Sequence, residues 1–222
     1  MQTYIALVLG APSETGRNPI GFALHLVGLL VVGQSFALNF AHSMEVANQE
    51  FPSILYQAGQ EIDFYLESEI SKNQNKKLNQ YLKLMSDVVV NGKIEHPSWG
   101  PVSLKVTFDH NLSDSCNNKF AHVYHDEREG NGFLANLVIC KSFFEISKRE
   151  FKIQVLVHEL GHVVLGVGEC LPMHFEHWVA HVSNQSFFWA QWFWDSEDCS
   201  SQSELKLPPL KNAIIRSMGL IP

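Results

Sequence analysis

Basic side chains are scarce in this chain of 222 residues, where 16 Lys and Arg stand against 23 Asp and Glu for a formal net charge of −7. Lys and Arg form no clustered face, which argues against nucleic acid as a partner. The sequence also lacks internal repeats, low-complexity tracts and Gly/Ser linkers inside its main body. Hydrophobic residues make up 45% of it, enough for one domain with a sizeable core, which excludes wholesale disorder.

Cysteine is also infrequent, and its spacing is informative. The four cysteines, Cys116, Cys140, Cys170 and Cys199, include no CxxC pair, which argues against zinc-knuckle and thioredoxin-like sites. Four cysteines allow three disulfide pairings, and the pairing between sequence neighbours would contribute about 3 kcal/mol per loop in an exported protein. The alternative is four buried free thiols in a cytosolic protein.

Charged side chains are absent from residues 19–41, an apolar run that follows Arg17. The run is typical of a signal-peptide core, and Ser35-Phe36-Ala37 offers small residues at a cleavage site. It is also about long enough to cross a bilayer as an uncleaved anchor. We expect a signal peptide or signal anchor over residues 1–43 and one functional domain over residues 44–222. That domain is expected to be secreted or periplasmic, or else membrane-anchored and facing outside the cytosol.

Apolar spacing predicts the secondary structure of the functional domain. The expected helices cover residues 52–70, 78–90, 148–165 and 173–193, with a short helix at 209–217. Alternating apolar residues predict three short strands, at 102–108, 120–124 and 134–140. The expected fold class is therefore α+β, predominantly helical, with a small mixed β-sheet ahead of the helix 148–165. We interpret the aromatic run at 187–194 as the packing face of the last long helix.

Histidine is abundant, with 11 copies, and two of them belong to an HExxH motif formed by His158, Glu159 and His162. Residues i and i+4 lie on one face of a helix, so both imidazoles can ligate one Zn²⁺ while Glu159 reaches the water that the metal activates. The residues around the motif are apolar, so this helix is expected to be buried. Two His and one Glu would be costly to bury without a partner, and a metal ion supplies one.

The stretch VLVHELGHVVLG at residues 155–166 resembles the active-site helix of the zincin metallopeptidases. Residues 137–144 resemble the strand-Cys-x-x-Phe-Phe segment ahead of that helix in aspzincins, which are secreted. The resemblance implies a zincin-like fold, a catalytic zinc and a disulfide from Cys140 to an upstream cysteine, a role that Cys116 could take. The GTxxD motif that supplies the third ligand of aspzincins is absent. The metzincin form HExxHxxGxxH is absent too, because positions 165 and 168 are Leu and Gly.

The third zinc ligand is not determined by the motif. The downstream candidates are Glu169, His174, Glu176, His177 and His181. Glu176 followed by Ala180 is similar to the ExxxA pattern on the second helix of gluzincins, so Glu176 is the expected ligand. The three histidines share another stripe of that helix, and one of them is the first alternative. Glu169 is a further alternative, because a chain reversal at Gly166-Val167-Gly168 would bring it near the metal.

Tyrosine is absent after His162, so an oxyanion donor from the C-terminal half has to be a histidine. His177 and His181 are the expected catalytic residues for this role. Tyr124 and His125 are alternatives, because zincins place the edge strand that lines the substrate cleft in the region ahead of the active-site helix.

Together these features predict a secreted zinc-dependent metallopeptidase, expected to be a monomer, with Glu159 as general base. The expected substrate is a protein or peptide, including cell-wall peptide, and a membrane is contacted only if the N-terminal segment is an uncleaved anchor. The competing interpretation is a non-catalytic extracellular binding module whose structural zinc takes a fourth ligand from residues 174–181. A third interpretation is an interaction protein that has lost its metal.

Overall fold

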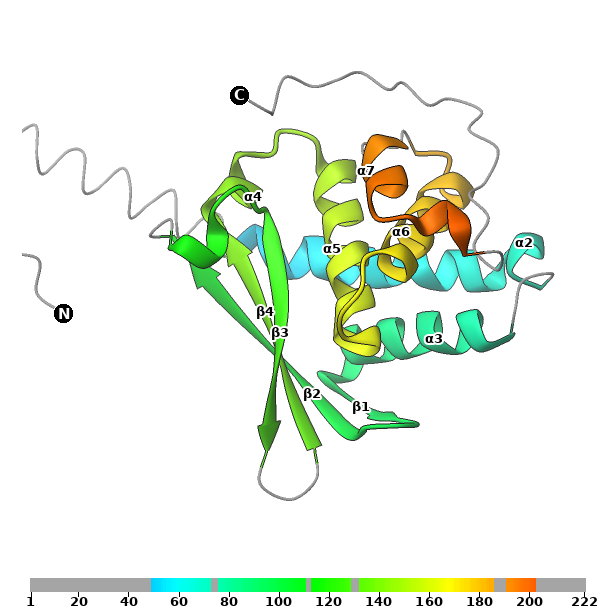
Figure 1. Cartoon of the computed structure of the whole chain (residues 1–222), viewed down its shortest axis with the longest axis horizontal. Coiled ribbons are helices and arrows are strands. Elements are labelled where there is room, and N and C mark those ends of the chain that lie inside the picture. Colours follow the sequence, from blue (N-terminus) through cyan, green and yellow to red (C-terminus); the bar gives the residue numbers. More distant parts are fainter. Residues whose placement is uncertain (1–48, 73–75, 111–112, 129–131, 186–190, 203–222) are drawn as a thin grey trace, which may run out of the picture. The chain divides into compact units, whose positions relative to one another are not determined.

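The computed structural model describes residues 49–72, 76–110, 113–128, 132–185 and 191–202 (Figure 1). The chain divides into two compact units, Met1–Ala47 and Asn48–Pro222, and the described residues all belong to the second. The expected leader and the expected helix at 209–217 lie outside the described residues. Within the described ranges, no helix has the length and apolar character needed to cross a membrane.

The helices follow the apolar spacing of the sequence closely. The first covers residues 49–67, and after it come α2 (Glu69–Lys72), α3 (Lys76–Asn91), α4 (Lys141–Glu145), α5 (Arg149–Leu165), α6 (Cys170–Val182) and α7 (Gln191–Ser196), with 3-10 turns η1 (Asp114–Cys116) and η2 (Cys199–Ser201). The helices expected at 52–70, 78–90 and 148–165 are confirmed to within a few residues.

The single helix expected at 173–193 is wrong, because α6 ends at Val182 and α7 is a separate element. The chain leaves the helix through Asn184, which has a positive φ of 53°. The N–H of Gln185 donates to the carbonyl of Ala180 (2.9 Å), and the N–H of Asn184 donates to that of His181 (3.2 Å). This is the Schellman termination, in which a left-handed residue satisfies the last carbonyls of a helix.

Four strands form one mixed sheet in the order β1-β2-β4-β3, namely β1 (Lys93–His96), β2 (Gly100–Asp109), β3 (Ala121–Arg128) and β4 (Gly132–Cys140). β2 and β4 are parallel, and the other two pairs are antiparallel. The three expected strands are confirmed, and so is an α+β class with a small mixed sheet ahead of α5. β1 was not expected, because turn residues flank its short run on both sides.

Helix α5 lies at the centre of the core, between the sheet and α6 (Figure 1). It packs against β3, α3 and α6, and every residue from Phe151 to Val164 is buried except His162, which is partly exposed. The first helix adds Ile54, Ala58 and Ile62 to the same core. The HExxH motif is therefore carried on a buried helix, as its apolar surroundings predicted.

A glycine permits the close crossing of α5 and α6. A Cβ built on Gly161 would lie 2.9 Å from Cα of Pro172, in the first turn of α6. Contacts that short with backbone atoms do not occur in relaxed structures, so only glycine fits at this point. The crossing brings the first half of α6 against the HExxH face of α5.

The four cysteines form two disulfides, Cys116–Cys140 and Cys170–Cys199. This is the pairing between sequence neighbours, and it includes the upstream partner that the aspzincin resemblance implied for Cys140. The first disulfide joins η1 to the end of β4, and the second joins the first residue of α6 to η2. Two disulfides are typical of proteins that fold in oxidising compartments.

We predict that Gly161→Ala destabilises the protein. Alanine normally stabilises a helix interior by about 1 kcal/mol relative to glycine. Here the added methyl group meets the backbone of Pro172, and overpacking of this kind costs about 1–3 kcal/mol. Because the overpacking outweighs the gain in helix propensity, we expect the free energy of unfolding, measured by urea titration, to fall by up to about 2 kcal/mol.

Gly59→Ala is the matched control, since Gly59 also lies inside a helix but the three atoms nearest its Cβ position belong to the side chain of Val89, at 3.1 Å or more, and not to backbone. That side chain can shift, so we expect the control to be as stable as the original protein or more so. A Gly161→Ala protein with unchanged or increased stability would show that the crossing does not require glycine.

Candidate metal centre

Three donor atoms meet at the C-terminal end of α5. The Nε2 atoms of His158 and His162 are 3.2 Å apart, because positions i and i+4 share one face of the helix. Oε2 of Glu169 lies 3.0 Å from Nε2 of His158 and 3.4 Å from Nε2 of His162. Two imidazoles and one carboxylate thus form a small triangle of potential metal ligands.

A tight turn brings Glu169 back over the helix that precedes it. α5 ends at Gly166, with a φ of 74°, and Gly168 has a φ of 111°. Both values lie in the region that only glycine adopts without strain, so the two glycines allow the chain to reverse within a few residues. Val167 between them is fully exposed, while Glu169 turns inward and immediately precedes α6.

The ring of His162 is oriented by the same turn. Its Nδ1 lies 3.0 Å from the carbonyl oxygen of Gly166. Because a carbonyl can only accept, Nδ1 carries the proton and donates it in this hydrogen bond. Nε2 then keeps its lone pair and faces the other two donors, which is the tautomer that a metal ligand requires.

His158 is oriented in the same way, by a carboxylate. Oε2 of Glu176 lies 3.2 Å from Nδ1 of His158, and Glu176 is completely buried. The structure therefore does not bring Glu176 to the Nε2 side, where the three donors meet. It places Glu176 behind His158, in the position from which carboxylates hold metal-ligating imidazoles.

Charges inside this cluster are strongly coupled. Burial on its own would lower the pKa of His158, but hydrogen bonds with Glu169 and Glu176 outweigh it and raise the value to about 10. In turn, contact with the imidazoles of His158 and His162 holds the pKa of Glu169 well below its ordinary range. The cluster thus favours positive charge at its centre, and a cation meets that preference.

Glu159, the central residue of the motif, is a buried carboxylate next to this cluster. Its Oε2 makes no hydrogen bond within the described part of the chain. Burial raises the pKa of Glu159, and the nearby His158 and His162 oppose that rise. A buried acid with an unsatisfied oxygen beside potential metal ligands fits a proton-transfer role better than a structural one.

The spacing of the donor triangle can be compared with that of a tetrahedral ion. Bonds of about 2.05 Å, as zinc makes to nitrogen and oxygen, place neighbouring ligand atoms ~3.3 Å apart. The three separations of 3.0, 3.2 and 3.4 Å scatter around this value. The residues present therefore fit a divalent cation bound by three protein ligands.

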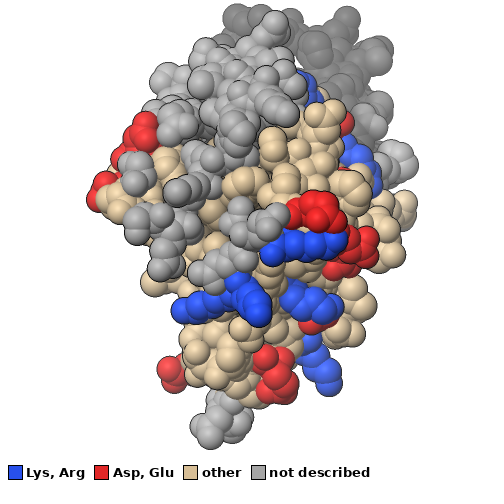
Figure 2. Space-filling view, turned by 90° about the vertical axis from the view of Figure 1, so that its right-hand side faces the viewer, with Lys and Arg blue, Asp and Glu red and all other residues tan. Residues whose placement is uncertain are grey.

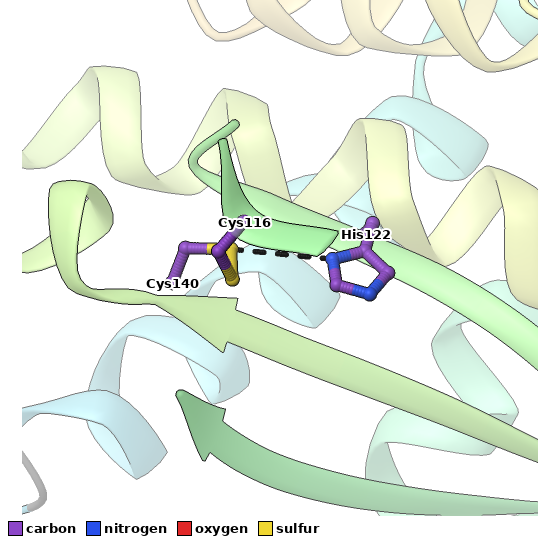
Figure 3. Close-up of side chains that lie close together, drawn as sticks. All are labelled: Cys116, His122 and Cys140. Atoms are coloured by element: carbon purple, nitrogen blue, oxygen red, sulfur yellow. Dashed lines mark hydrogen bonds between the residues drawn. A yellow bond between two sulfur atoms is a disulfide. The ribbon is translucent and has the colours of Figure 1, made fainter. Parts of the chain in front are cut away.

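A second group with metal-ligand side chains, Cys116, His122 and Cys140, lies at the far end of β4 (Figure 3). Its two sulfur atoms are bonded to each other, and Nδ1 of His122 lies 4.0 Å from Sγ of Cys140. A metal requires thiolates, and a disulfide offers none. In this state the group is a structural crosslink.

The three histidines of α6 point elsewhere. The ring of His177 lies 6.2 Å from that of Trp194 in α7, and the ring of His181 lies 5.8 Å from that of Trp178. His174 packs against Phe175 and Trp178. None of the three belongs to the groups of close metal-ligand atoms found among the described residues. The structure thus does not gather His177 and His181, the expected oxyanion donors, with His158 and His162.

The alternatives on β3 are divided between the two faces of the sheet. Nε2 of His125 lies 3.2 Å from the carbonyl oxygen of Val163, one residue beyond the motif, and its ring packs on Trp99. Tyr124 is half exposed and stacks on His122, on the opposite face, because side chains alternate along a strand. Of the two, only His125 contacts the motif-bearing helix.

The face of the molecule in Figure 2 carries, on its described residues, no patch of one charge sign that would indicate a second binding site. Lys and Arg side chains there are interspersed with Asp and Glu. Among the described residues, Lys83 pairs with Asp87 at 2.7 Å, and Lys72 pairs with Glu69. Exposed pairs of this kind are ordinary solvated surface and contribute little to stability.

Comparisons with known proteins add no relative: no family model matches the chain, and no curated protein or solved structure is significantly similar to it. Any function assigned to this centre must therefore come from its residues and their geometry. The signal that points to Glu169 in the sequence is the pair of glycines around Val167, which permits the reversal.

The two buried histidines of α6, His174 and His177, predict that the folded protein loses stability in acid. Burial lowers the pKa of His174 to about 4, and burial together with His174 lowers that of His177 to about 3. An unfolded histidine has a pKa near 6.5, so below that pH the unfolded chain binds more protons than the folded one. Stability should therefore fall as the pH drops from about 6.5 towards 3, by roughly 1.4 kcal/mol per pH unit for each histidine.

The measurement is urea unfolding of metal-free protein at pH 7 and pH 4.5, because acid also releases bound metal. His177→Gln removes one titrating group, so its stability should fall by about 2 kcal/mol less over this range. His110→Gln, at the end of β2 and outside α6, is the control. An equal pH dependence in the His177 variant and the original protein would show that His177 is not buried in its neutral form.

Proposed function

We propose that this chain is a zinc-dependent peptidase that hydrolyses peptide bonds outside the cytosol. The observation that carries the proposal is the triangle of His158, His162 and Glu169 donors with the buried Glu159 beside it. Nitrogen and oxygen ligands with one open direction are typical of catalytic rather than structural zinc. The two disulfides and the expected leader support an exported protein.

In this proposal Glu169 is the third ligand, and Glu176 positions His158. The assignment departs from the sequence-based expectation of Glu176, and it rests on which imidazole nitrogen each carboxylate contacts. With both imidazoles neutral, a single carboxylate ligand leaves a zinc site with a net charge near +1. That charge is low enough to be buried and high enough to act on water near neutral pH.

Bound zinc supplies Lewis-acid chemistry, polarising a carbonyl group and lowering the pKa of water. Glu159 accepts the proton of the attacking water and passes it to the amine that leaves. With zinc bound, His158 and His162 would be neutral and would direct their Nε2 lone pairs at the centre, since the Gly166 carbonyl and the Glu176 carboxylate lie at their Nδ1 atoms. Donors for the oxyanion remain a prediction, with His177 and His181 as the sequence-based choice and His125 as the alternative that contacts α5.

An extended peptide is the substrate form that the sheet favours. β3 pairs only with β4 among the described strands, so its other edge presents unpaired backbone groups. This edge strand runs along α5 and is joined to it by the contact of His125 with Val163. A peptide can add to such an edge as one more strand. An edge strand that lines the substrate cleft, in the region ahead of the active-site helix, is also what the zincin resemblance implies.

The competing interpretation, a structural zinc in a binding module, needs a fourth protein ligand. Within the described residues the group around His158 and His162 contains only one further donor, Glu169. A structural site would also leave the buried Glu159 carboxylate without a use. Both points favour catalysis.

We predict that Glu169→Ala and Glu176→Gln have different effects on zinc binding. Loss of a direct ligand should weaken zinc binding by about 100-fold or more, while loss of an orienting carboxylate should weaken it by about 10-fold. Competition with a chromophoric chelator at pH 7 measures both dissociation constants. A Glu169→Ala protein that binds zinc normally, beside a Glu176→Gln protein that does not, would return the ligand role to Glu176.

We predict that Glu159→Gln retains about one zinc per chain but loses at least 100-fold in the rate of hydrolysis, because it removes the base and not a ligand. The rate is measured with an unstructured protein such as a dye-labelled casein, and the metal by elemental analysis. Glu150→Gln, in the exposed first turn of α5, is the control and should retain full activity. Near-normal turnover in Glu159→Gln would refute its role as base.

A further inference from the structure

The proposed zinc ligand Glu169 is covalently next to a disulfide. Cys170 follows it directly and is bonded to Cys199 in η2, with 5.2 Å between the two Cα atoms. Cys199 is completely buried and Cys170 almost so. The disulfide is thus the nearest crosslink to the metal centre.

On its N-terminal side Glu169 has little support. The turn that precedes it contains two glycines with positive φ and a fully exposed Val167. Nothing lies within 4 Å of the Cβ position of Gly168. The conformational freedom of glycine makes such a turn a weak constraint on the position of Glu169.

On its C-terminal side Glu169 depends on the first turn of α6. The later residues of α6, such as Phe175 and Val179, belong to the main core. Cys170 and Met173 instead form a separate small cluster with Trp194 and Cys199, and the disulfide lies at its centre. The first turn of α6, next to Glu169, is therefore joined to α7 and η2 by this small cluster and its crosslink.

From this arrangement we infer that the Cys170–Cys199 disulfide is a positioning group for Glu169, so that the centre binds zinc tightly only in its oxidised form. The inference rests on the proposed function, since it takes Glu169 as a zinc ligand. It makes metal loading depend on passage through an oxidising compartment. A chain that has not formed this disulfide would hold zinc by two histidines and a loosely placed carboxylate.

Reduction is a two-electron step. The Sγ–Sγ bond breaks, each sulfur takes up a proton, and a phosphine reductant is oxidised to its oxide with oxygen from water. A phosphine serves better than a dithiol in the test, because thiolates themselves bind zinc.

The other disulfide provides a matched control. Cys116–Cys140 closes a loop of similar length, with a sequence separation of 24 against 29 for Cys170–Cys199. It joins η1 to the end of β4, and the described residues place no proposed zinc ligand within its cluster. Because the two disulfides close loops of similar length, they should contribute similarly to the stability of the fold. A difference in zinc affinity between the two variants would therefore come from the position of the Cys170–Cys199 disulfide beside Glu169 and not from a general loss of stability.

The test compares the full chain with two double variants, Cys170→Ala/Cys199→Ala and Cys116→Ala/Cys140→Ala. Zinc dissociation constants are measured by chelator competition at pH 7, and unfolding of the metal-free proteins by urea. We expect the first variant to bind zinc at least about 10-fold more weakly and the second to stay within about threefold of the original. Cobalt in place of zinc should lose its tetrahedral absorption bands only in the first variant.

Reduction supplies a second measurement if the first variant does not fold. The Cys116→Ala/Cys140→Ala protein retains only Cys170–Cys199, so the phosphine acts on that bond alone. Zinc affinity should fall after reduction once the freed thiols of Cys170 and Cys199 are blocked by alkylation, since free thiolates would bind zinc themselves, and in an unblocked sample it should return on reoxidation. Equal zinc affinity before and after reduction, or equal losses in the two double variants, would overturn the inference while leaving the zinc site intact. An original protein that binds no zinc would instead overturn the proposed function itself.

Discussion

The rest of the centre depends on one imidazole held between two carboxylates. α5 passes through the apolar core, so its polar side chains have to find partners inside the protein. His158 finds Glu169 on one ring nitrogen and Glu176 on the other, at 3.0 and 3.2 Å. Since Glu169 immediately precedes α6 and Glu176 lies in the middle of it, these contacts also fix how α6 lies against α5.

Two features of the backbone make that double contact possible. Helix α6 has to start soon after α5 ends and then cross it at close range. The glycines on either side of Val167 provide the reversal, and Gly161 provides the room for Pro172. With a side chain at Gly161 the helices would separate, and the carboxylates would lose their reach to His158. Glycine at these positions is therefore needed for the contacts between the carboxylates and His158 as well as for the packing of the two helices.

Much of this arrangement could be predicted from the sequence, because it depends on local periodicity. The spacing of His158 and His162 and the apolar residues around them are properties of one helix. The alternation of apolar residues with period two is likewise a local property of each strand. The break of the last long helix at Asn184 could not be predicted, since asparagine also occurs inside helices. The role of Glu169 could not be predicted either, because it depends on how α6 crosses α5. The sequence pattern ExxxA favoured Glu176 as the ligand, but the chain reversal at Gly166 and Gly168 brings Glu169 to Nε2 of His158 instead.

The charge balance explains how this geometry exists before a metal ion binds. The imidazole of His158, protonated because its pKa is raised to about 10, is compensated by Glu169 and Glu176, so the donor atoms stay together. A divalent cation that replaced this proton would meet the same oxygen and nitrogen atoms, and little conformational entropy would be lost on binding. Glu159 contributes to this balance only through its charge, and its Oε2 lacks a hydrogen bond among the described residues. A buried carboxylate of that kind costs stability, and proteins tolerate such costs mainly at functional sites.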